Sequence, residues 1–369
     1  MKRKKDKRTL DDVVDLGRSH VDRGELAQAE ACFREALAME PEHLGVITLL
    51  GLLLVEREKF EPAIDLLERA RDAAPEFAPV QLALGSAYAG AGHDDLAVVA
   101  METAIKLDTT STVPLERLAK HYIVARKPRE AIGLLRRVLR RDPTHAHAQF
   151  LLAGLTGDQP GAAPPSPPAE LIADLFDAYA TKFDEHLVGG LQYSAPKALA
   201  ALVSETGAKA DGTWRVVDLG CGTGLAGIDV RPYAKTLIGS DLSPRMIARA
   251  RERKLYDELH VEDLVTTLTR ERDVDLVVAT DVFIYVGALE ATFAACATAL
   301  RTVGLLAFSV ERSDGEDVIL GSTLRYSHSD GYIRRLADAH GLTVLRAEPT
   351  TLRVEEAKPV AGVLYILQR

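Results

Sequence analysis

A repeat with a period of about 34 residues runs through the first part of the chain. A leucine followed by a small residue marks the same place in four successive copies, Leu16-Gly17, Leu50-Gly51, Leu84-Gly85 and Leu118-Ala119. Alanine recurs with the same period at Ala29, Ala63, Ala97 and Ala131. Small residues at fixed positions let antiparallel helices approach closely, so this spacing predicts helix pairs that stack on one another to bury a continuous core.

A second series keeps the same phase and marks the end of each copy. It consists of Ala36, Ala70 and Ala104, with Val138 in the fourth place. Prolines that cannot continue a helix follow at Pro41, Pro75 and Pro143, whereas Thr109 stands at the third such position. The pattern resembles the tetratricopeptide repeat, with four repeats over about residues 10–145 and a capping helix at about 146–155.

The resemblance implies an interaction surface on the concave face, formed by the first helix of each pair. The family's concave positions correspond here to a largely apolar set, Arg18, Leu52, Val55, Leu82, Ala89, Glu116, Lys120, Ile123 and Val124. We expect this groove to hold an apolar helix or extended segment of a protein or peptide partner. The alternative is that the groove packs on the chain's own second domain.

Composition changes after the repeats and indicates four regions. A basic tail covers residues 1–9, the repeat array 10–155, a linker 156–169 and a second domain 170–369. The linker, TGDQPGAAPPSPPA, is rich in proline, glycine and alanine and has no apolar periodicity. Such a composition predicts a semi-extended spacer.

The overall charge and the cysteines exclude several classes of protein. The formal net charge of −9 argues against a protein that coats nucleic acid. No apolar run is long enough to span a bilayer, and the basic N-terminus lacks the apolar stretch of a secretory signal, so we expect a cytoplasmic protein. Cys32, Cys221 and Cys296 lie too far apart in sequence to indicate a metal site or a disulfide framework, and we expect each to be buried. The Ala/Arg-rich composition suits a GC-rich bacterial genome.

Strand and helix patterns alternate in the second domain. Helices are expected near 170–183 and 194–207, followed by strands near 214–219, 236–241, 258–261, 274–280, 302–310, 342–347 and 361–368. Alternation predicts an α/β Rossmann-like domain with a mostly parallel seven-stranded sheet. The last two strands have no crossover helix between them, so the final strand is expected to be antiparallel.

The first of these strands runs directly into a glycine-rich turn. Gly220, Gly222 and Gly224 permit a sharp turn and let a ligand approach the backbone, and Asp241 ends the next strand, where it could accept hydrogen bonds from both hydroxyls of a ribose. Gly222, Gly224 and Gly227 also match the dinucleotide motif formally. Asp218, at the mouth of the turn, would repel a diphosphate but suit an ammonium group.

Two stretches, VVDLGCGTGL and DLSPRMIARAR, resemble the first two motifs of class I S-adenosylmethionine-dependent methyltransferases. The resemblance implies that Gly220, Gly222 and Gly224 line the methionine part of S-adenosylmethionine, with Asp218 nearby. It places Asp241 on the ribose and the remaining residues on the adenine, namely Leu242 and Met246 on its faces and Asp263 at its amino group.

An aromatic stripe precedes the sheet. Phe176, Tyr179 and Phe183 share one helix face in FDAYATKFD, which resembles the lid pattern FDxYAxxFD of some methyltransferases. The resemblance implies that Tyr179 and a later tyrosine, Tyr193, close over the cofactor. The alternative is an ordinary stripe that faces the core.

Candidate acceptor-side residues come from two later segments. Asp281 and Tyr285 follow the fourth strand, which lacks the Asn/Asp-Pro-Pro-Tyr/Phe signature of enzymes that methylate amide or exocyclic amino nitrogens. In a loop expected near 324–332, Arg325 and Tyr326 could contact the substrate and His328 could act as a base. The alternatives are a satisfied strand-end carboxylate for Asp281 and polar surface for His328.

These observations favour an S-adenosylmethionine-dependent methyltransferase that acts on a small molecule or a protein, with the repeats recruiting a partner. The alternative from another class is an interaction scaffold whose second domain binds the cofactor without turnover. A nicotinamide oxidoreductase is a third, weaker interpretation, because of Asp218.

Overall fold

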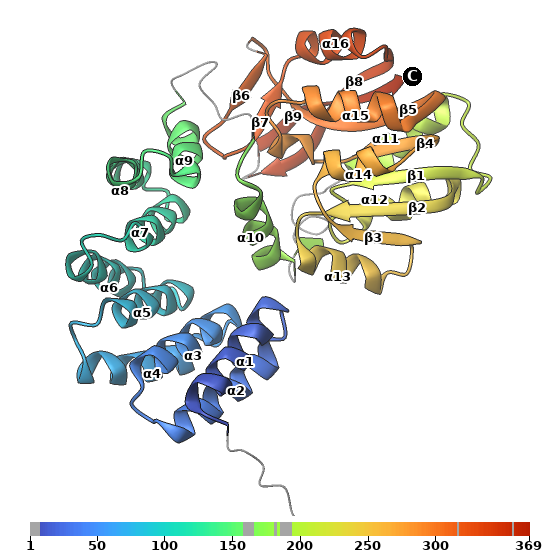
Figure 1. The fold of residues 1–369 in the computed structure, drawn as a ribbon. Coiled ribbons are helices and arrows are strands. Elements are labelled where there is room, and N and C mark those ends of the chain that lie inside the picture. Colours follow the sequence, from blue (N-terminus) through green and yellow to red (C-terminus); the bar gives the residue numbers. More distant parts are fainter. Residues whose placement is uncertain (1–7, 158–165, 181–182, 185–193, 316, 356–357) are drawn as a thin grey trace, which may run out of the picture. The chain divides into compact units, whose positions relative to one another are not determined.

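A computed structural model describes residues 8–157, 166–180, 183–184, 194–315, 317–355 and 358–369. The chain divides into two compact units, residues 1–148 and 149–369, and each is considered by itself (Figure 1). In the described ranges, no helix combines the length and the apolar content that a bilayer-spanning segment needs.

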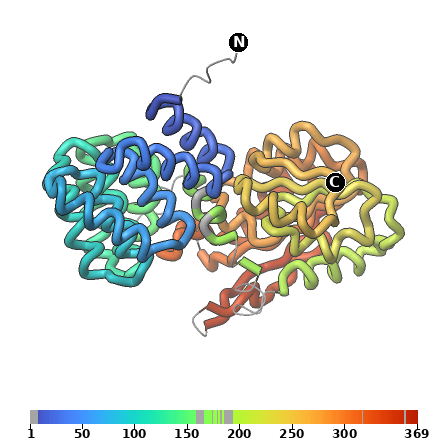
Figure 2. Tube along the Cα trace, turned by 90° about the horizontal axis from the view of Figure 1, so that it is seen from below, coloured from blue at the N-terminus to red at the C-terminus, as the bar shows by residue number. Residues whose placement is uncertain are grey.

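The first unit consists of four antiparallel helix pairs, visible as successive hairpins in Figure 2. The pairs are α1 (Leu10–Asp22) with α2 (Leu26–Met39), α3 (Leu44–Glu56) with α4 (Phe60–Ala73), α5 (Ala78–Gly90) with α6 (Asp94–Leu107), and α7 (Val113–Val124) with α8 (Pro128–Arg141). The periodic alanines are buried in every copy, including Ala29, Ala63, Ala97 and Ala131. This placement confirms the predicted helix-pair array.

Close contact within each pair explains the periodic glycines. A Cβ atom added to Gly17, Gly51 or Gly85 would lie 2.6–2.7 Å from a side chain of the second helix. The side chains that meet these glycines, Phe33, Leu67 and Met101, recur with the period of the repeat. The first three helix pairs therefore use the same small-against-large contact, which leaves no room for a side chain at the glycine position, and the fourth pair has Ala119 there.

The turns inside the pairs share one backbone conformation. Gly24, Glu58, Gly92 and Arg126 occupy equivalent positions in the four copies, and all have positive φ, between 56° and 81°. Glycine adopts this left-handed region freely, whereas other residues adopt it at some cost. The repeat geometry thus requires the same turn conformation in all four copies, both where the residue is glycine and where it is Glu58 or Arg126, for which this conformation is less favourable.

Helix α9 (Ala146–Thr156) begins at the boundary between the units and, from Gln149 on, belongs to the second. Within the second unit the Phe150 ring lies 6.3 Å from the ring of Tyr326, and a Cβ on Gly154 would touch Leu324. The limits of the array, linker and second domain inferred from the sequence stay predictions.

The second unit is an α/β domain built on one sheet (Figure 1). Its parallel strands lie in the order β3 (Glu258–Val261), β2 (Ala234–Asp241), β1 (Trp214–Leu219), β4 (Val274–Ala279) and β5 (Leu300–Arg312). Strand β9 (Lys358–Gln368) pairs antiparallel with β5 and with β8 (Thr343–Glu355). The mostly parallel sheet and its antiparallel last strand confirm the prediction.

Two short strands extend the sheet beyond the seven that were predicted. Strand β6 (Val318–Leu320) pairs antiparallel with β7 (Tyr326–His328), and β7 continues the sheet parallel to the end of β5. The segment expected as a loop near 324–332 therefore includes a strand. So short a stretch does not show the alternation of apolar and polar residues that predicts a strand. It forms a strand because its backbone pairs with Glu311 and Arg312 of β5.

Helices cover both faces of this sheet. One face packs against α14 (Leu264–Arg270), α15 (Glu290–Ala299) and α16 (Asp330–Ala339), and the other against α11 (Ala195–Glu205) and α12 (Leu225–Val230). Alternate residues of β1 point to opposite faces, with Val217 in the first core and Val216 in the second. Helices α10 (Ala169–Tyr179) and α13 (Pro244–Glu252) and the short helical turns η2 (Arg231–Tyr233) and η3 (Phe283–Tyr285) complete the unit. Because both central faces are covered, the carboxyl edge of the strands is the natural place for a ligand.

Candidate active site

A cavity of about 600 Å³ opens at this carboxyl edge. Its floor is formed by the ends of β1, β2 and β4, and its walls by α10 and the start of α15. The predicted residues that line it are Gly220, Gly222, Asp241, Leu242, Asp263, Asp281 and Tyr285. The ends of four strands, β1 to β4, thus bring together residues that lie far apart in the sequence.

The glycine turn after β1 has three residues in the left-handed region. Gly220, Gly222 and Gly224 have φ values of 58°, 55° and 90°. A Cβ on Gly220 would lie 2.7 Å from Val282, whereas a Cβ on Gly222 would meet nothing closer than Phe183, at 3.7 Å. Gly220 therefore serves the close packing of the turn, and Gly222 leaves open space on the cavity side.

The ring of Tyr256 accounts for Gly224 and Gly227, the other two glycines of the formal dinucleotide motif, and also for Gly239 in β2. Cβ atoms on Gly224, Gly227 and Gly239 would all lie within 2.9 Å of this ring. The Tyr256 hydroxyl donates a hydrogen bond of 2.6 Å to Asp218 Oδ2. These glycines make room for a side chain and not for a diphosphate, and the sequence alone does not reveal this role.

Asp218 is a buried carboxylate with one unused oxygen. Its Oδ2 accepts from Tyr256, but its Oδ1 has no hydrogen-bond partner. Burial raises the pKa of Asp218 to about 7, against the opposing effect of the Tyr256 hydrogen bond. An unpaired buried carboxylate oxygen is costly unless a donor completes it. Asp218 precedes the cavity residue Gly220 by two positions in the chain, but neither Asp218 nor Gly224 itself lines the cavity.

Asp241, at the end of β2, is held in place by the backbone. Gly222 N donates to its Oδ2 at 3.0 Å and Ser243 N to its Oδ1 at 2.8 Å, and burial raises the pKa of the carboxyl. Leu242 lines the cavity beside it. Met246 does not, because the side chain is fully buried in the core under α13. The placement of Met246 therefore does not match its predicted position beside an adenine.

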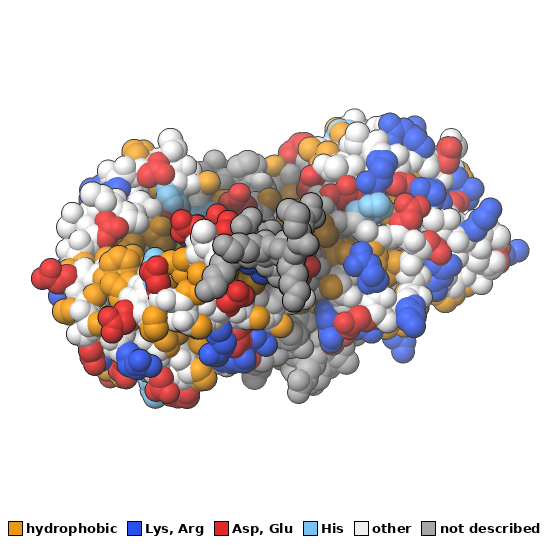
Figure 3. All heavy atoms as spheres, turned by 60° about the horizontal axis from the view of Figure 1, so that its bottom comes forward, with side chains coloured by type: hydrophobic (Ala, Val, Ile, Leu, Met, Phe, Trp, Pro, Cys, Tyr) orange, Lys and Arg blue, Asp and Glu red, His pale blue; other side chains and the backbone are white. Residues whose placement is uncertain are grey.

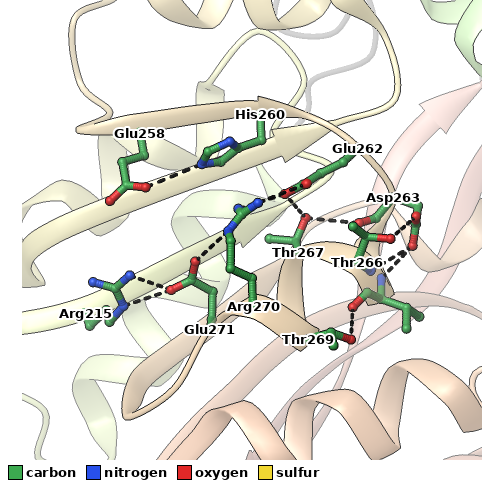
Figure 4. Close-up of polar contacts among 11 residues, drawn as sticks. Arg215, Glu258, His260, Glu262, Asp263, Thr266, Thr267, Thr269, Arg270 and Glu271 are labelled. Carbon is green, nitrogen blue, oxygen red and sulfur yellow. Dashed lines mark hydrogen bonds and ion pairs between the residues drawn. The ribbon is translucent and has the colours of Figure 1, made fainter.

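Asp263 lines the cavity. It also has a structural task, through the polar contacts with Thr266 that Figure 4 shows. Its Oδ1 accepts from Val265 N and Thr266 N at 3.0 Å, so it caps the N-terminus of α14. Although burial opposes it, hydrogen bonds from Thr266 hold the pKa of Asp263 below its usual value. The neighbouring Glu262 also lines the cavity and pairs with Arg270 at 2.8 Å.

The residues of the aromatic stripe differ in position, because some line the cavity and one packs against those that do. Phe176 and Phe183 line the cavity, whereas Tyr179 packs edge-on against Phe183, with ring centroids 5.5 Å apart. The predicted position of Tyr179 over a cofactor is therefore taken by its phenylalanine neighbours. Tyr193 lies outside the described residues.

Two aspartates of the same segment bind the loops that follow β1 and β2. Asp177 accepts a hydrogen bond from Ser243 Oγ and one of 3.1 Å from Arg245 N, beside Asp241. Asp184 accepts from Thr223 Oγ1 in the glycine turn and pairs with Arg253. The sequence contains a signal for both, since each directly follows a phenylalanine of the stripe.

Asp281, directly after β4, has an unfavourable backbone conformation. Its φ is 55°, although it is not glycine, and Ser309 Oγ accepts from its N at 2.8 Å. Its carboxylate accepts from Ser309 Oγ at 3.2 Å and from Arg353 Nη1 at 3.1 Å. Burial nevertheless raises the pKa of Asp281, against the Arg353 charge. Such strain in a cavity wall is characteristic of functional positions.

Arg353, which no sequence pattern singles out, organises this side of the cavity from β8. The side chain is buried and pairs with Asp281, Glu311 and Glu355. Arg325 pairs with Glu355 and donates to the Tyr285 hydroxyl at 3.4 Å. Arg325 thus acts on the cavity through Tyr285 and does not line it.

The other two residues predicted from the segment near 324–332, Tyr326 and His328, are part of the core. Tyr326 is 1% exposed and packs against Phe150. His328, also 1% exposed, lies against the carbonyls of Val286 and Gly287 at 3.0 and 3.1 Å, and burial lowers its pKa to about 4. These placements do not support the predicted substrate contact or the predicted base, because neither side chain reaches the cavity.

Comparisons with known proteins agree with both parts of the chain. A methyltransferase domain family matches residues 217–306, and two tetratricopeptide repeat families match residues 20–87 and 116–155. No curated protein matches the sequence.

Several solved structures are similar at low identity. Magnesium protoporphyrin IX methyltransferase from Synechocystis PCC 6803 with bound SAM is 18% identical, with a TM-score of 0.44 over 55% of this chain and 96% of that one. The N-methyltransferase NodS from Bradyrhizobium japonicum WM9 with S-adenosyl-L-homocysteine is 21% identical, with a TM-score of 0.38 over 47% and 85%. MamA from Desulfovibrio magneticus RS-1 is 21% identical, with a TM-score of 0.33 over 37% and 77%.

The sheet order, the glycine turn and the matching domain family converge on one assignment. The chain carries a methyltransferase domain, preceded by tetratricopeptide repeats.

Proposed function

We propose that the second domain binds S-adenosylmethionine in the cavity and transfers its methyl group to a small molecule or a protein, while the repeats recruit a partner or the substrate. One observation carries the proposal. Asp218 and Asp241 flank a left-handed glycine turn at the carboxyl ends of β1 and β2, and the Oδ1 atom of Asp218 lacks a partner.

The residues present fit this cofactor. Asp218 Oδ1 offers an acceptor to the ammonium group, and the open side of Gly222 leaves space for the ligand backbone. Asp241, fixed by two backbone N–H groups, presents its remaining lone pairs to the ribose hydroxyls. Leu242 would contact the adenine, and Asp263 or Glu262 would accept from its amino group.

When bound, S-adenosylmethionine supplies an activated methyl group on a positively charged sulfur. The protein's task is then to orient the acceptor and to exclude water. Phe176 and Phe183 close the cavity on one side, and Asp177 and Asp184 hold their segment to the turn and to the loop after β2. Asp281 and Tyr285 remain on the acceptor side.

The alternative scaffold function, binding without turnover, is less favoured by the site. Asp281 and Tyr285 line the cavity in addition to the residues assigned to the cofactor, which a domain used only for cofactor binding would have no reason to retain. A nicotinamide oxidoreductase is disfavoured because Gly224 and Gly227 accommodate Tyr256.

The repeats are proposed to bind an apolar segment of a protein partner. Figure 3 shows hydrophobic side chains gathered on the surface of the part of the chain that carries the repeats. Among the predicted groove residues, Leu52 and Val124 are exposed, by 37% and 84%. A binding assay with peptides of different charge would show which kind of segment the repeats bind.

Calorimetric titration of the full chain with S-adenosylmethionine tests the proposal. We expect binding, and a loss of affinity on the order of 10- to 100-fold in Asp241→Ala, because a buried charge-assisted hydrogen bond is removed. Asp338→Ala, an exposed aspartate on α16, is the control and should bind like the wild type. Unaltered affinity in Asp241→Ala would refute the ribose site, and binding of NAD in its place would refute the methyltransferase assignment.

A further inference from the structure

We infer that the acceptor is an amine on a largely apolar body, recognised by the carboxylates of Asp281 inside the cavity and Glu290 at its mouth. The inference deepens the proposed function and rests on it. Among the described residues that line the cavity, none is Lys, Arg or His. An anionic acceptor would find no cation in this wall, whereas a cationic one finds two carboxylates.

Glu290 is the outer of the two. It is the first residue of α15, it is exposed, and it lines the cavity next to Ala291 and Thr292. Its carboxylate accepts from the Tyr332 hydroxyl at 3.1 Å, which orients it without neutralising its charge. A carboxylate at the mouth of a largely apolar cavity attracts cations from solution.

Asp281 is the inner one and belongs to a charge cluster with an excess of acid. Asp281, Glu311 and Glu355 share Arg353, and Arg325 pairs with Glu355, so three carboxylates face two guanidinium groups. Both arginines are engaged with carboxylates and do not line the cavity. The cluster therefore presents one net negative charge to the acceptor side.

The wall of the cavity also carries aromatic and apolar side chains. Phe176 and Tyr285 line it edge to face, with ring centroids 5.2 Å apart, together with Ile172 and Val286. Aromatic faces attract ammonium groups as well as apolar surface. This combination favours an amine with an aliphatic or aromatic substituent over a sugar or a phosphate ester.

These carboxylates are distinct from those assigned to the cofactor. Strand β1 lies between β2, which ends in Asp241, and β4, which precedes Asp281. Two strand spacings separate the ends of β2 and β4 by about 10 Å. Asp281 thus lies on the side of the cavity that the ribose assignment leaves unused.

The chemistry of the step is consistent with this arrangement. Burial raises the pKa of Asp281, so its carboxylate can take a proton from the entering ammonium and leave a neutral amine. The amine nitrogen then donates its lone pair to the methyl carbon while the carbon–sulfur bond breaks and its electron pair stays on sulfur. The product leaves as a methylated ammonium, and Asp281 returns its proton to water.

The test compares three probes with one apolar body, 4-phenylbutylamine, 4-phenylbutyrate and 4-phenylbutanol. Each is titrated calorimetrically into the full chain saturated with S-adenosylhomocysteine, and methylation is followed separately with S-adenosylmethionine by mass spectrometry. We expect the amine to bind most tightly and to gain one methyl group. Its affinity should fall as salt is raised, since the attraction is electrostatic.

Two variants connect the preference to the named carboxylates. Asp281→Asn should weaken amine binding by about 10-fold or more, and Glu290→Gln by about 2- to 5-fold because it is exposed. Neither should change binding of the alcohol. Glu348→Gln removes an exposed charge of β8 outside the cavity and should change neither.

The outcomes separate this inference from the proposed function. If S-adenosylmethionine does not bind, the proposed function fails, and the acceptor assignment fails with it. If it binds and the amine shows no preference over the alcohol and the acid, including the case in which none of the three binds, only the acceptor assignment is overturned.

Discussion

The repeats and the methyltransferase domain use the left-handed backbone region for opposite purposes. In the repeats, positive φ recurs once in each copy, at Gly24, Glu58, Gly92 and Arg126, and turns one helix into the next. In the second domain it occurs at several separate turns, and two of these places, the glycine turn and Asp281, lie at the ligand cavity. The first use is periodic and architectural, whereas the second follows no period and, in those two places, shapes the wall of a ligand cavity.

The same contrast holds for contacts. A repeat position meets a partner in the next helix along the chain, as Gly85 meets Met101, and the contact recurs in neighbouring copies. The cavity residues come from segments far apart in sequence, as Phe183 and Asp281 do. A substitution in the repeats should therefore affect stability through one recurring contact, and a substitution near the cavity should affect binding through several segments.

The largest expected effect concerns the helix contact in the repeats. Gly85→Leu should lower the free energy of unfolding of the repeats by about 3 kcal/mol, because its Cβ would collide with Met101 and approach the backbone of α6. Gly133→Leu is the matched control. This glycine is exposed in α8 with nothing within 4 Å of an added Cβ, so the change should stabilise by about 0.5–1 kcal/mol. Urea denaturation measures both, and equal effects would contradict the packing role of the periodic glycine.

The next effect concerns pH and Asp218. Its pKa of about 7 lies above the usual value of 3.8, so the folded protein without ligand keeps this proton to higher pH than the unfolded chain. The free energy of unfolding should therefore fall as pH rises from about 4 to about 7. Affinity for S-adenosylmethionine should rise roughly 10-fold between about pH 6 and about pH 8, because the ammonium group prefers the ionised carboxylate.

Asp218→Asn is the control for that titration. It should remove both pH dependences relative to the wild type while keeping a partner for the Tyr256 hydroxyl. Calorimetry and denaturation over this pH range measure them. An unchanged slope in the variant would assign the titration to another buried carboxyl, such as Asp241.

A smaller effect is expected from the two aspartates that hold the aromatic segment. Asp177→Ala and Asp184→Ala should each lower affinity for S-adenosylmethionine by about 5-fold, because the loops after β2 and β1 lose a partly exposed hydrogen-bonded contact. The exposed control Asp338→Ala should leave it unchanged. If both variants bind like the wild type, the aspartates order only their own segment.

The smallest effect tests the periodic turn. Arg126→Gly should raise the free energy of unfolding by about 0.5 kcal/mol, because glycine adopts the observed φ of 56° without strain. Asp281→Gly relieves the same kind of strain, but it also removes the carboxylate from the cavity and from Arg353. A gain in stability without loss of acceptor binding in Asp281→Gly would remove the distinction between the two uses of positive φ.

The sequence alone determined the repeats, the succession of strands up to β5 and the glycine turn. Repeats reveal themselves because each copy meets the same packing requirement at the same position, and the glycine turn because its backbone tolerates few other residues. The antiparallel β9 followed from the absence of a crossover segment.

Only the tertiary structure decided which polar side chains reach the cavity. Several of the side chains around the cavity have hydrogen-bond partners 38 to 72 positions away in the sequence, namely those of Arg353, Tyr256, Asp177 and Asp184. No local sequence pattern indicates which residues these partners are. Three residues that were predicted to lie at the ligand site have side chains buried in the core, namely Met246, Tyr326 and His328. Periodicity reports which face of an element is apolar, whereas the direction of one polar side chain depends on contacts between distant elements.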